Sequence, residues 1–171
     1  MTPNTSKRSA LSDDLIVLFA IALVDVLVHV LFSGQYGFHR DELDIVMNAR
    51  QLDRGYVAYP PLTPLLARFG LALFGPSLVG LRLLPALGQG IVVVLTGLMA
   101  RDMGGGRFAQ GLAAVAAAIA SVALSAGLLI QYLSFDYVWW MVVVFCVVRL
   151  LKTEDPRGGS SPIRLFRPIS A

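Results

Sequence analysis

The sequence predicts an all-α, polytopic membrane protein with four transmembrane helices. Hydrophobic residues make up 56% of the 171 residues, charged residues make up only 15%, and the mean hydropathy is +0.71. Soluble domains are roughly 45–50% apolar and about 25% charged. So few charges cannot cover the surface of so many apolar side chains, so lipid must solvate much of the chain. These values exclude an ordinary soluble domain.

The first expected span covers residues 15–32 and follows a polar segment, residues 1–14. Its length is about sufficient to cross a bilayer. A cleaved signal peptide is the alternative, but the apolar region is too long and no small-residue cleavage site precedes Gln35. We therefore expect an uncleaved anchor.

Three further apolar runs predict spans at 78–100, 108–130 and 135–151. A glycine-rich turn, residues 101–107, joins the middle two. Residues 153–171 are polar and rich in Gly and Pro, which predicts a disordered tail. The membrane domain is thus expected at 15–152, with a long polar loop at 33–77.

The distribution of basic residues predicts that both termini lie in the cytoplasm. Most Lys and Arg side chains then fall on the inner side of the plasma (inner) membrane, as the positive-inside rule requires. Those residues are Lys7, Arg8, Arg101, Arg107, Arg149, Lys152, Arg157, Arg164 and Arg167. The net charge of +3 and the pI near 9.4 are attributed to these loops, and no nucleic-acid partner is expected.

The loop at 33–77 is expected to lie outside the cytoplasm and to contain two helices. One is predicted over 41–54, with Gly55 as its stop. The other is predicted over 62–74, which is very apolar, carries only Arg68 and is too short to cross a bilayer. An interfacial helix is the natural assignment for it.

Ionisable groups are densest at His39, Arg40, Asp41, Glu42 and Asp44, directly after the first span. Neighbouring carboxylates beside Arg and His are suited to acid–base chemistry or to holding a cation. The alternative is a helix N-terminus with Asp41 as N-cap and the other acids favoured by the helix dipole. Both interpretations can hold together.

Two other acids fall within or beside spans. Asp25 and His29 are four residues apart and share a helix face; a charged residue at mid-span costs about 2.5–3.5 kcal/mol on insertion scales. They could satisfy each other or face a polar cavity. Asp136 lies at the outer mouth of the last span beside Trp139 and Trp140, as an interfacial residue or as part of the site.

Arginines on the outer side can bind the phosphate of a lipid-linked donor, or they can pair with headgroups and acids. They are Arg50, Arg54, Arg68 and Arg82.

The lone Cys146 excludes an intrachain disulfide and is expected to pack. Small residues recur every four positions in the third span and favour close helix packing; they are Ala109, Ala113, Ala117, Ser121 and Ser125.

Four motifs together resemble the N-terminal part of bacterial family 39 glycosyltransferases, relatives of protein O-mannosyltransferases and aminoarabinose transferases. They are YGFHRDEL (36–43), DRGYV (53–57), YPPLTPL (59–65) and GLRLLP (80–85). The resemblance extends over about residues 15–157. It implies the N-terminal part of the GT-C fold and a polyprenyl-phosphate sugar as donor.

The resemblance also implies roles for individual residues. Asp41 is the expected general base, supported by Glu42, and Asp136 is expected to line the same cavity. The other substrate-binding residues expected from it are His39, Arg40, Arg54, Tyr59 and Arg82. Relatives often carry an acid and then His or Lys before the Pro-Pro pair, where this chain has Ala58 and Tyr59, so no metal is assigned, although a divalent metal stays open.

The leading expectation is a membrane glycosyltransferase that transfers a hexosyl or pentosyl group to an acceptor outside the cytoplasm. Family members are about three times as long, so the chain is expected to be truncated relative to them. The alternative is a non-catalytic scaffold or fragment that associates with another membrane subunit through helix–helix contacts. A transporter is a third expectation, motivated by Asp25 and His29; four spans without an internal repeat disfavour it.

Overall fold

The computed structural model describes residues 4–56 and 59–153, and all regular structure among them is helical. The helices are α1 (Asn4–Ser33), α2 (Arg40–Arg50), α3 (Leu62–Phe74), α4 (Leu78–Asp102), α5 (Arg107–Ile119), α6 (Ser121–Leu128) and α7 (Tyr132–Thr153). The predicted all-α class is therefore confirmed. Of the polar segment predicted at 1–14, residues 4–14 belong to α1 and residues 1–3 lie outside the described residues. Of the disordered tail predicted at 153–171, residue 153 ends α7 and residues 154–171 lie outside the described residues.

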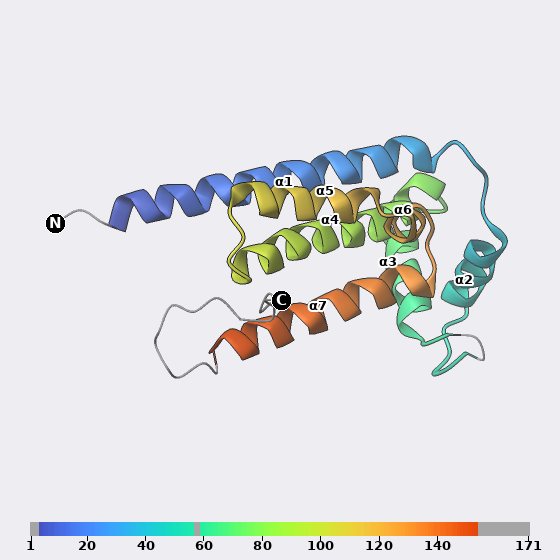
Figure 1. Cartoon of the computed structure of the whole chain (residues 1–171). Helices are drawn as coiled ribbons and strands as arrows, with labels where there is room; N and C mark the ends of the chain where they lie inside the picture. Colours follow the sequence, from blue (N-terminus) through green and yellow to red (C-terminus); the bar gives the residue numbers. More distant parts are fainter. Residues whose placement is uncertain (1–3, 57–58, 154–171) are drawn as a thin grey trace, which may run out of the picture.

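The long helices run side by side, and α2 and α3 lie together at one end of the bundle, here called the loop end (Figure 1). Helix α4 is central, because α1, α3, α5, α6 and α7 all pack against it. Part of the core within the bundle joins α1 to α4 and α5 through Leu18, Ala22, Val93 and Ala114, all buried. Small residues at these contacts let the helix backbones approach closely.

Within the described part of the chain, three helices are long and apolar enough to cross a bilayer: the segments Asp13–Ser33, Leu78–Asp102 and Tyr132–Lys152. Their surfaces are largely apolar, which identifies a multi-pass helical membrane protein. The apolar helix predicted at 62–74 is present as α3 with those bounds and is too short to cross.

The third predicted span is not a continuous helix. Helices α5 and α6 are bent by 60° at Ala120, whose backbone is extended (φ −62°, ψ 133°). Helices α5 and α6 make a fourth crossing only if the two together form one broken span. Four uninterrupted spans are therefore not confirmed. Alanine and serine do not force this break, since alanine is the best helix former.

Tertiary contacts on both sides stabilise the bent path. The Gln89 side-chain amide donates from Nε2 to the carbonyl oxygen of Ala117, 3.3 Å away, just before the break. After α6, the backbone N–H of Ile130 donates to Glu42 at 3.1 Å. Because these bonds satisfy backbone groups that a bent helix leaves free, the break costs less than its sequence would suggest.

Helix α2 begins and ends earlier than predicted. His39, not Asp41, is the N-cap, and its side chain accepts the backbone N–H of Asp41 while Glu42 accepts that of His39. The helix ends at Arg50 rather than at residue 54. Tyr56, which follows the helix, donates its hydroxyl to the carbonyl oxygen of Asn48 in the last turn. A side chain that follows the helix thus helps to set its C-terminus.

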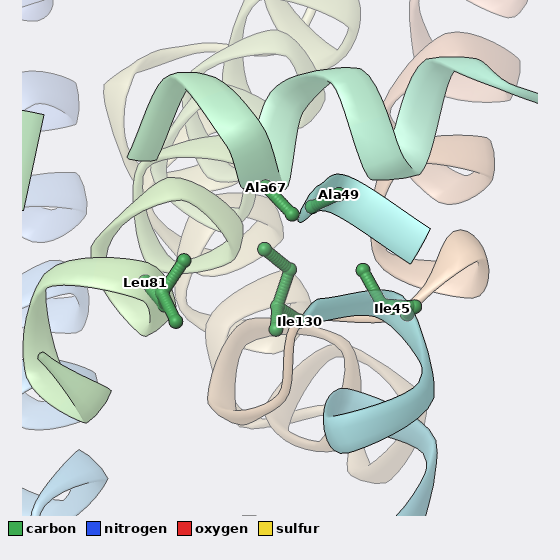
Figure 2. Packing of buried hydrophobic residues seen from close by; sticks show 5 residues of the cluster. All are labelled: Ile45, Ala49, Ala67, Leu81 and Ile130. Carbon is green, nitrogen blue, oxygen red and sulfur yellow. The ribbon is translucent and has the colours of Figure 1, made fainter. Parts of the chain in front are cut away.

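A small apolar core fastens the loop end. Figure 2 shows Ile45 and Ala49 of α2 beside Ala67 of α3, Leu81 of α4 and Ile130 of the α6–α7 connection. All five side chains are at most 2% exposed. Segments far apart in sequence are thereby held in one arrangement, which positions the polar residues around them.

Candidate functional site

A buried ion pair lies at the centre of the loop end. Arg82 of α4 donates to both carboxylate oxygens of Glu42, from Nε to Oε1 at 2.8 Å and from Nη2 to Oε2 at 2.6 Å. Glu42 is 1% exposed and Arg82 is 4% exposed. This two-pronged geometry is the strongest pairing available to a carboxylate and a guanidinium.

Glu42 has two further donors, the backbone N–H groups of His39 (2.9 Å) and Ile130 (3.1 Å). Burial by itself would raise the pKa of Glu42. The hydrogen bonds from Arg82, His39 and Ile130 more than offset that effect, so the pKa lies below its ordinary value. The carboxylate is therefore ionised and saturated with hydrogen bonds.

Arg82 also holds the connection between α1 and α2. Its guanidinium donates to the carbonyl oxygens of Ser33, Tyr36 (3.2 Å) and Gly37 (2.9 Å). Glu42 and Arg82 together thus tie four parts of the chain: the α1–α2 connection, α2, α4 and the α6–α7 connection. We call this arrangement the Glu42–Arg82 clasp.

A separate polar cavity of about 470 Å³ lies beside the N-terminal half of α2. It is lined by Arg40, Asp41, Asp44, Ile45, Tyr59, Gln131 and Tyr132. Helix α2 contributes the charged groups, and the connection into α7 contributes Gln131 and Tyr132. We call it the α2 cavity; concave sites with a few convergent polar groups are where small ligands bind.

Asp41 is the accessible acid of the α2 cavity. Its side chain is 57% exposed, and Nδ1 of His39 lies 3.6 Å from its Oδ2. The adjacent side chains of Asp41 and Glu42 therefore differ completely in their exposure. The first is open to the cavity, whereas the second is enclosed in the clasp and is not among the cavity-lining residues.

Tyr59 forms the opposite side of the α2 cavity. Its hydroxyl donates to Oδ2 of Asp44 at 2.6 Å and accepts from the side-chain amide of Asn48. Burial and the hydrogen bond to Asp44 raise the pKa of Tyr59 to about 12. The phenol is therefore a stable hydrogen-bond donor at neutral pH, and Asp44 is held in place by it.

Aromatic rings line one side of this site. The Tyr59 ring stacks on Tyr132 with centroids 6.5 Å apart and on Tyr56 with centroids 5.7 Å apart. Aromatic pairs prefer such offset stacking, which fixes the ring positions. Of these rings, Tyr59 and Tyr132 line the cavity.

The structure thus brings together some of the sequence-predicted site residues and separates others. Arg40, Asp41 and Tyr59 line the α2 cavity, and His39 lies at its edge as the cap of α2. Arg54 is exposed in the following loop, and Asp136 is exposed one turn after Tyr132 on α7; neither lines the cavity.

Gln131 and Tyr132 are cavity residues that the sequence did not single out. Their only signal was a position directly before a span, close to Asp136 and the tryptophan pair. Proximity to α2 was not visible from the sequence, because it depends on the Ile130 hydrogen bond to Glu42 across 88 residues.

The described residues contain no group of three or more His, Cys, Asp or Glu side chains that could hold a metal ion. Asp41 and Asp44 face the cavity with Arg40, whose positive charge disfavours a cation there. The donor set therefore does not fit a resident divalent metal.

Two other arginines flank a second cavity of about 400 Å³ between α2 and α3. Arg68 donates to the carbonyl oxygens of Ala49 (3.3 Å) and Arg50 (3.4 Å), and Arg50 and Arg68 both line the cavity. Arg68 thereby satisfies the carbonyl end of α2, where a positive charge is favoured by the helix dipole.

Comparison with protein-family models, with curated proteins and with solved structures gives no match. The fold and the site therefore define the class alone: a multi-pass helical membrane protein with a polar, aromatic-lined cavity at one end of its bundle.

Proposed function

We propose that this protein transfers a sugar from a polyprenyl-phosphate donor to an acceptor outside the cytoplasm. The observation that carries the proposal is the α2 cavity, where the exposed Asp41 carboxylate lies beside Arg40 and the stacked tyrosine rings. Two of the four motifs that resemble family 39 glycosyltransferases contribute to the lining of this cavity, the first through Arg40 and Asp41 and the third through Tyr59. A carboxylate, a guanidinium and aromatic faces are the groups that a phosphate-linked sugar requires.

In the proposed reaction Asp41 is the general base. Its carboxylate takes the proton of the acceptor hydroxyl as that oxygen forms a bond to the anomeric carbon. The bond from the anomeric carbon to the phosphate oxygen breaks, and the electron pair leaves with the polyprenyl phosphate. The single displacement inverts the anomeric configuration and needs no covalent enzyme intermediate.

Arg40 is the proposed phosphate contact, because its guanidinium lines the cavity with Asp41. The sequence favours Arg54 and Arg82 as phosphate contacts instead, but Arg54 does not line the cavity. The donors of Arg82 are occupied by Glu42 and by three backbone carbonyls. We therefore assign Glu42 and Arg82 a positioning role: the clasp holds the N-terminus of α2, and thus Asp41, against the α6–α7 connection.

The proposal is tested with membranes from cells that express the chain and from cells that lack it. Membranes are incubated with radiolabelled polyprenyl-phosphate hexoses and pentoses, and the label in non-lipid products is counted. Asp41→Asn should lower transfer by about 10²–10⁴-fold, the usual contribution of a general base, at unchanged protein level. Asp53→Asn is the matched control, because Asp53 is exposed on the same loop but does not line the cavity.

Full transfer by the Asp41→Asn chain would refute the assigned base. Absence of chain-dependent transfer from every donor tested would refute the glycosyltransferase itself. An Asp53→Asn loss equal to that of Asp41→Asn would show a general effect of the loop rather than base catalysis.

The second candidate is a non-catalytic membrane subunit, and the surface of α7 favours it. Only 6% of the most apolar window of α7 is buried, and Trp139, Trp140 and Val143 are at least half exposed. Such a surface is suited to lipid or to a partner helix. Stable co-purification with one membrane protein, unaffected by Asp41→Asn and lost on Trp139→Ala, would support this candidate over the enzyme.

A further inference from the structure

Two ionisable side chains lie inside the membrane-spanning part of α1, away from the α2 cavity. Asp25 and His29 occur within the span Asp13–Ser33 and are 6% and 1% exposed. They face the protein interior rather than lipid, as intramembrane ionisable groups with a function normally do. The proposed sugar transfer makes no use of them.

The orientation of His29 is fixed by its own helix. Its Nδ1 lies 2.8 Å from the backbone carbonyl oxygen of Asp25 and 3.5 Å from Asp25 Oδ1. A carbonyl oxygen only accepts, so Nδ1 carries a proton. Nε2 then points at α6, where a Cβ at Gly127 would lie 2.4 Å from it.

Three buried polar atoms in this part of the bundle have no hydrogen-bond partner among the described residues: Asp25 Oδ2, His29 Nε2 and Gln89 Oε1. A buried carboxylate oxygen without a donor is strongly disfavoured. A proton, a hydrogen-bond donor or a nearby positive charge would remove that cost for Asp25.

The surroundings of Asp25 leave few sources for that charge. Helix α4 presents the neutral Gln89 near Asp25. The ionisable residues of α4 are elsewhere: Arg82 is paired in the clasp at the loop end, and Arg101 and Asp102 lie at the other end of α4. Helix α5 has an ionisable residue only at its first position, Arg107, and α6 has none. Within the described helices, His29 is the sole ionisable partner of Asp25 at this depth.

The break in the third predicted span lies next to the same carboxylate. Asp25 lines a cavity of about 420 Å³ together with Ala118 and Ile119 at the end of α5 and Leu124 of α6. The other side chains that line this cavity are apolar, so Asp25 is its single ionisable group. Broken helices at membrane depth mark the ion sites of many transport proteins.

We propose that Asp25 and His29 form a proton-binding site inside the membrane, in which the pair holds one exchangeable proton and bears no net charge. With the proton bound, either a neutral carboxyl stands beside a neutral imidazole or a carboxylate stands beside an imidazolium. Release of the proton to water leaves the pair with one negative charge. A proton suits this site because the partners available here are one carboxylate and one imidazole, too few ligands for a metal ion.

The test uses the full chain in lipid nanodiscs and does not depend on sugar transfer. The chain has two histidines, so His39→Asn leaves His29 as the sole imidazole, and asparagine preserves a side-chain N-cap at position 39. Nitrogen-15 NMR of this variant reports whether His29 is neutral or protonated. Infrared spectroscopy reports the protonated carboxyl band, assigned by its loss in Asp25→Asn.

At neutral pH we expect either a protonated carboxyl that belongs to Asp25 or an imidazolium at His29. Raising the pH should release one proton per chain, and Asp25→Asn should abolish that release, whereas Asp53→Asn should keep it. If Asp25→Asn does not fold, carbon-13 labelling of aspartate assigns the band by its isotope shift in the native chain. An ionised Asp25 beside a neutral His29 at neutral pH would overturn the proposal, whether or not the chain transfers sugar.

Discussion

Asp41 and Glu42 show how strongly one residue step changes a carboxylate. Successive helix positions are about 100° apart, so the two side chains leave α2 in different directions. Glu42 points to the centre of the loop end, where Arg82 and two backbone N–H groups surround it. Asp41 points to the α2 cavity and stays 57% exposed. Only Asp41 is therefore accessible to a substrate, because the oxygens of Glu42 are buried and occupied by donors.

Loss of the Glu42 charge should strongly destabilise the fold. Glu42→Gln leaves the Arg82 guanidinium buried without its counter-ion, and breaking a buried pair in this way costs about 3–5 kcal/mol. Denaturant unfolding in detergent micelles measures the free energy of unfolding. Exposed Asp53→Asn should change it by less than about 0.5 kcal/mol. Equal stability of the two variants would contradict the clasp.

The clasp also predicts a pH dependence of stability. The pKa of Glu42 is lower in the folded chain than its ordinary value of 4.5, so the ionised form stabilises the fold. That stability is complete above pH 4.5 and is lost as the pH falls through the lowered pKa of the folded state.

Thermal unfolding of the native chain should therefore show a drop in Tm on acidification that begins below pH 4.5. The difference in Tm between the native chain and Glu42→Gln should shrink over the same range, because protonation removes the same charge. A difference that stays constant with pH would show that Glu42 is not ionised in the fold.

Among the elements, the α5–α6 pair departs most from its sequence pattern. An Ala-rich apolar run predicts one continuous helix, and the local propensities of residues 107–128 agree with that prediction. The bend at Ala120 instead follows from contacts with other elements, namely Gln89 before the break, His29 against Gly127, and Glu42 beyond α6. None of these is local in sequence.

Gly127→Ala tests the contact between α6 and α1. A Cβ at position 127 would lie 2.4 Å from His29 Nε2 and 2.6 Å from Cδ2, so the ring or α6 must shift. Overpacking of this kind costs about 1–3 kcal/mol. Denaturant unfolding of the purified chain checks the loss of stability.

Gly111→Ala supplies the control, because a Cβ on α5 at that position meets nothing within 4 Å. It should stabilise the helix by about 0.5–1 kcal/mol through its better propensity. If both variants behave alike, His29 does not pack on Gly127 as described.

At the scale of the whole molecule, the long apolar helices require a bilayer, and the loop end carries the candidate chemistry on one side of it. Basic residues concentrate at the opposite ends of the helices. At that end Arg149 and Lys152 pair with Asp102, at 2.5 Å and 3.3 Å. From the positive-inside rule we expect that end to lie in the cytoplasm.

This orientation predicts the outcome of cysteine labelling in intact cells. With Cys146→Ala as background, Asp53→Cys at the loop end should react with a membrane-impermeant maleimide, whereas Met103→Cys should react only after the membrane is permeabilised. Both native side chains are exposed. Reaction of the two positions from the same side would refute the assigned topology.

Much of this architecture was accessible from the sequence because it depends on local averages. Apolar runs predicted the helices at 15–32, 78–100 and 135–151, and the Pro-Pro and Gly-Pro boundaries predicted α3 with its bounds. The acidic group after the first span was also visible, and three of its members line the α2 cavity: Arg40, Asp41 and Asp44.

What the sequence by itself determined is the helical, membrane-embedded class and the region that carries the ionisable groups, since hydropathy and charge density follow directly from composition. Only the tertiary structure decided which acid is accessible, which arginine is occupied and where the third span breaks. Those outcomes depend on partners 28 to 88 residues away: Arg82 for Glu42, Ala117 for Gln89 and Ile130 for Glu42. A buried polar atom must find a donor or acceptor wherever the fold supplies one, and sequence spacing does not encode that position.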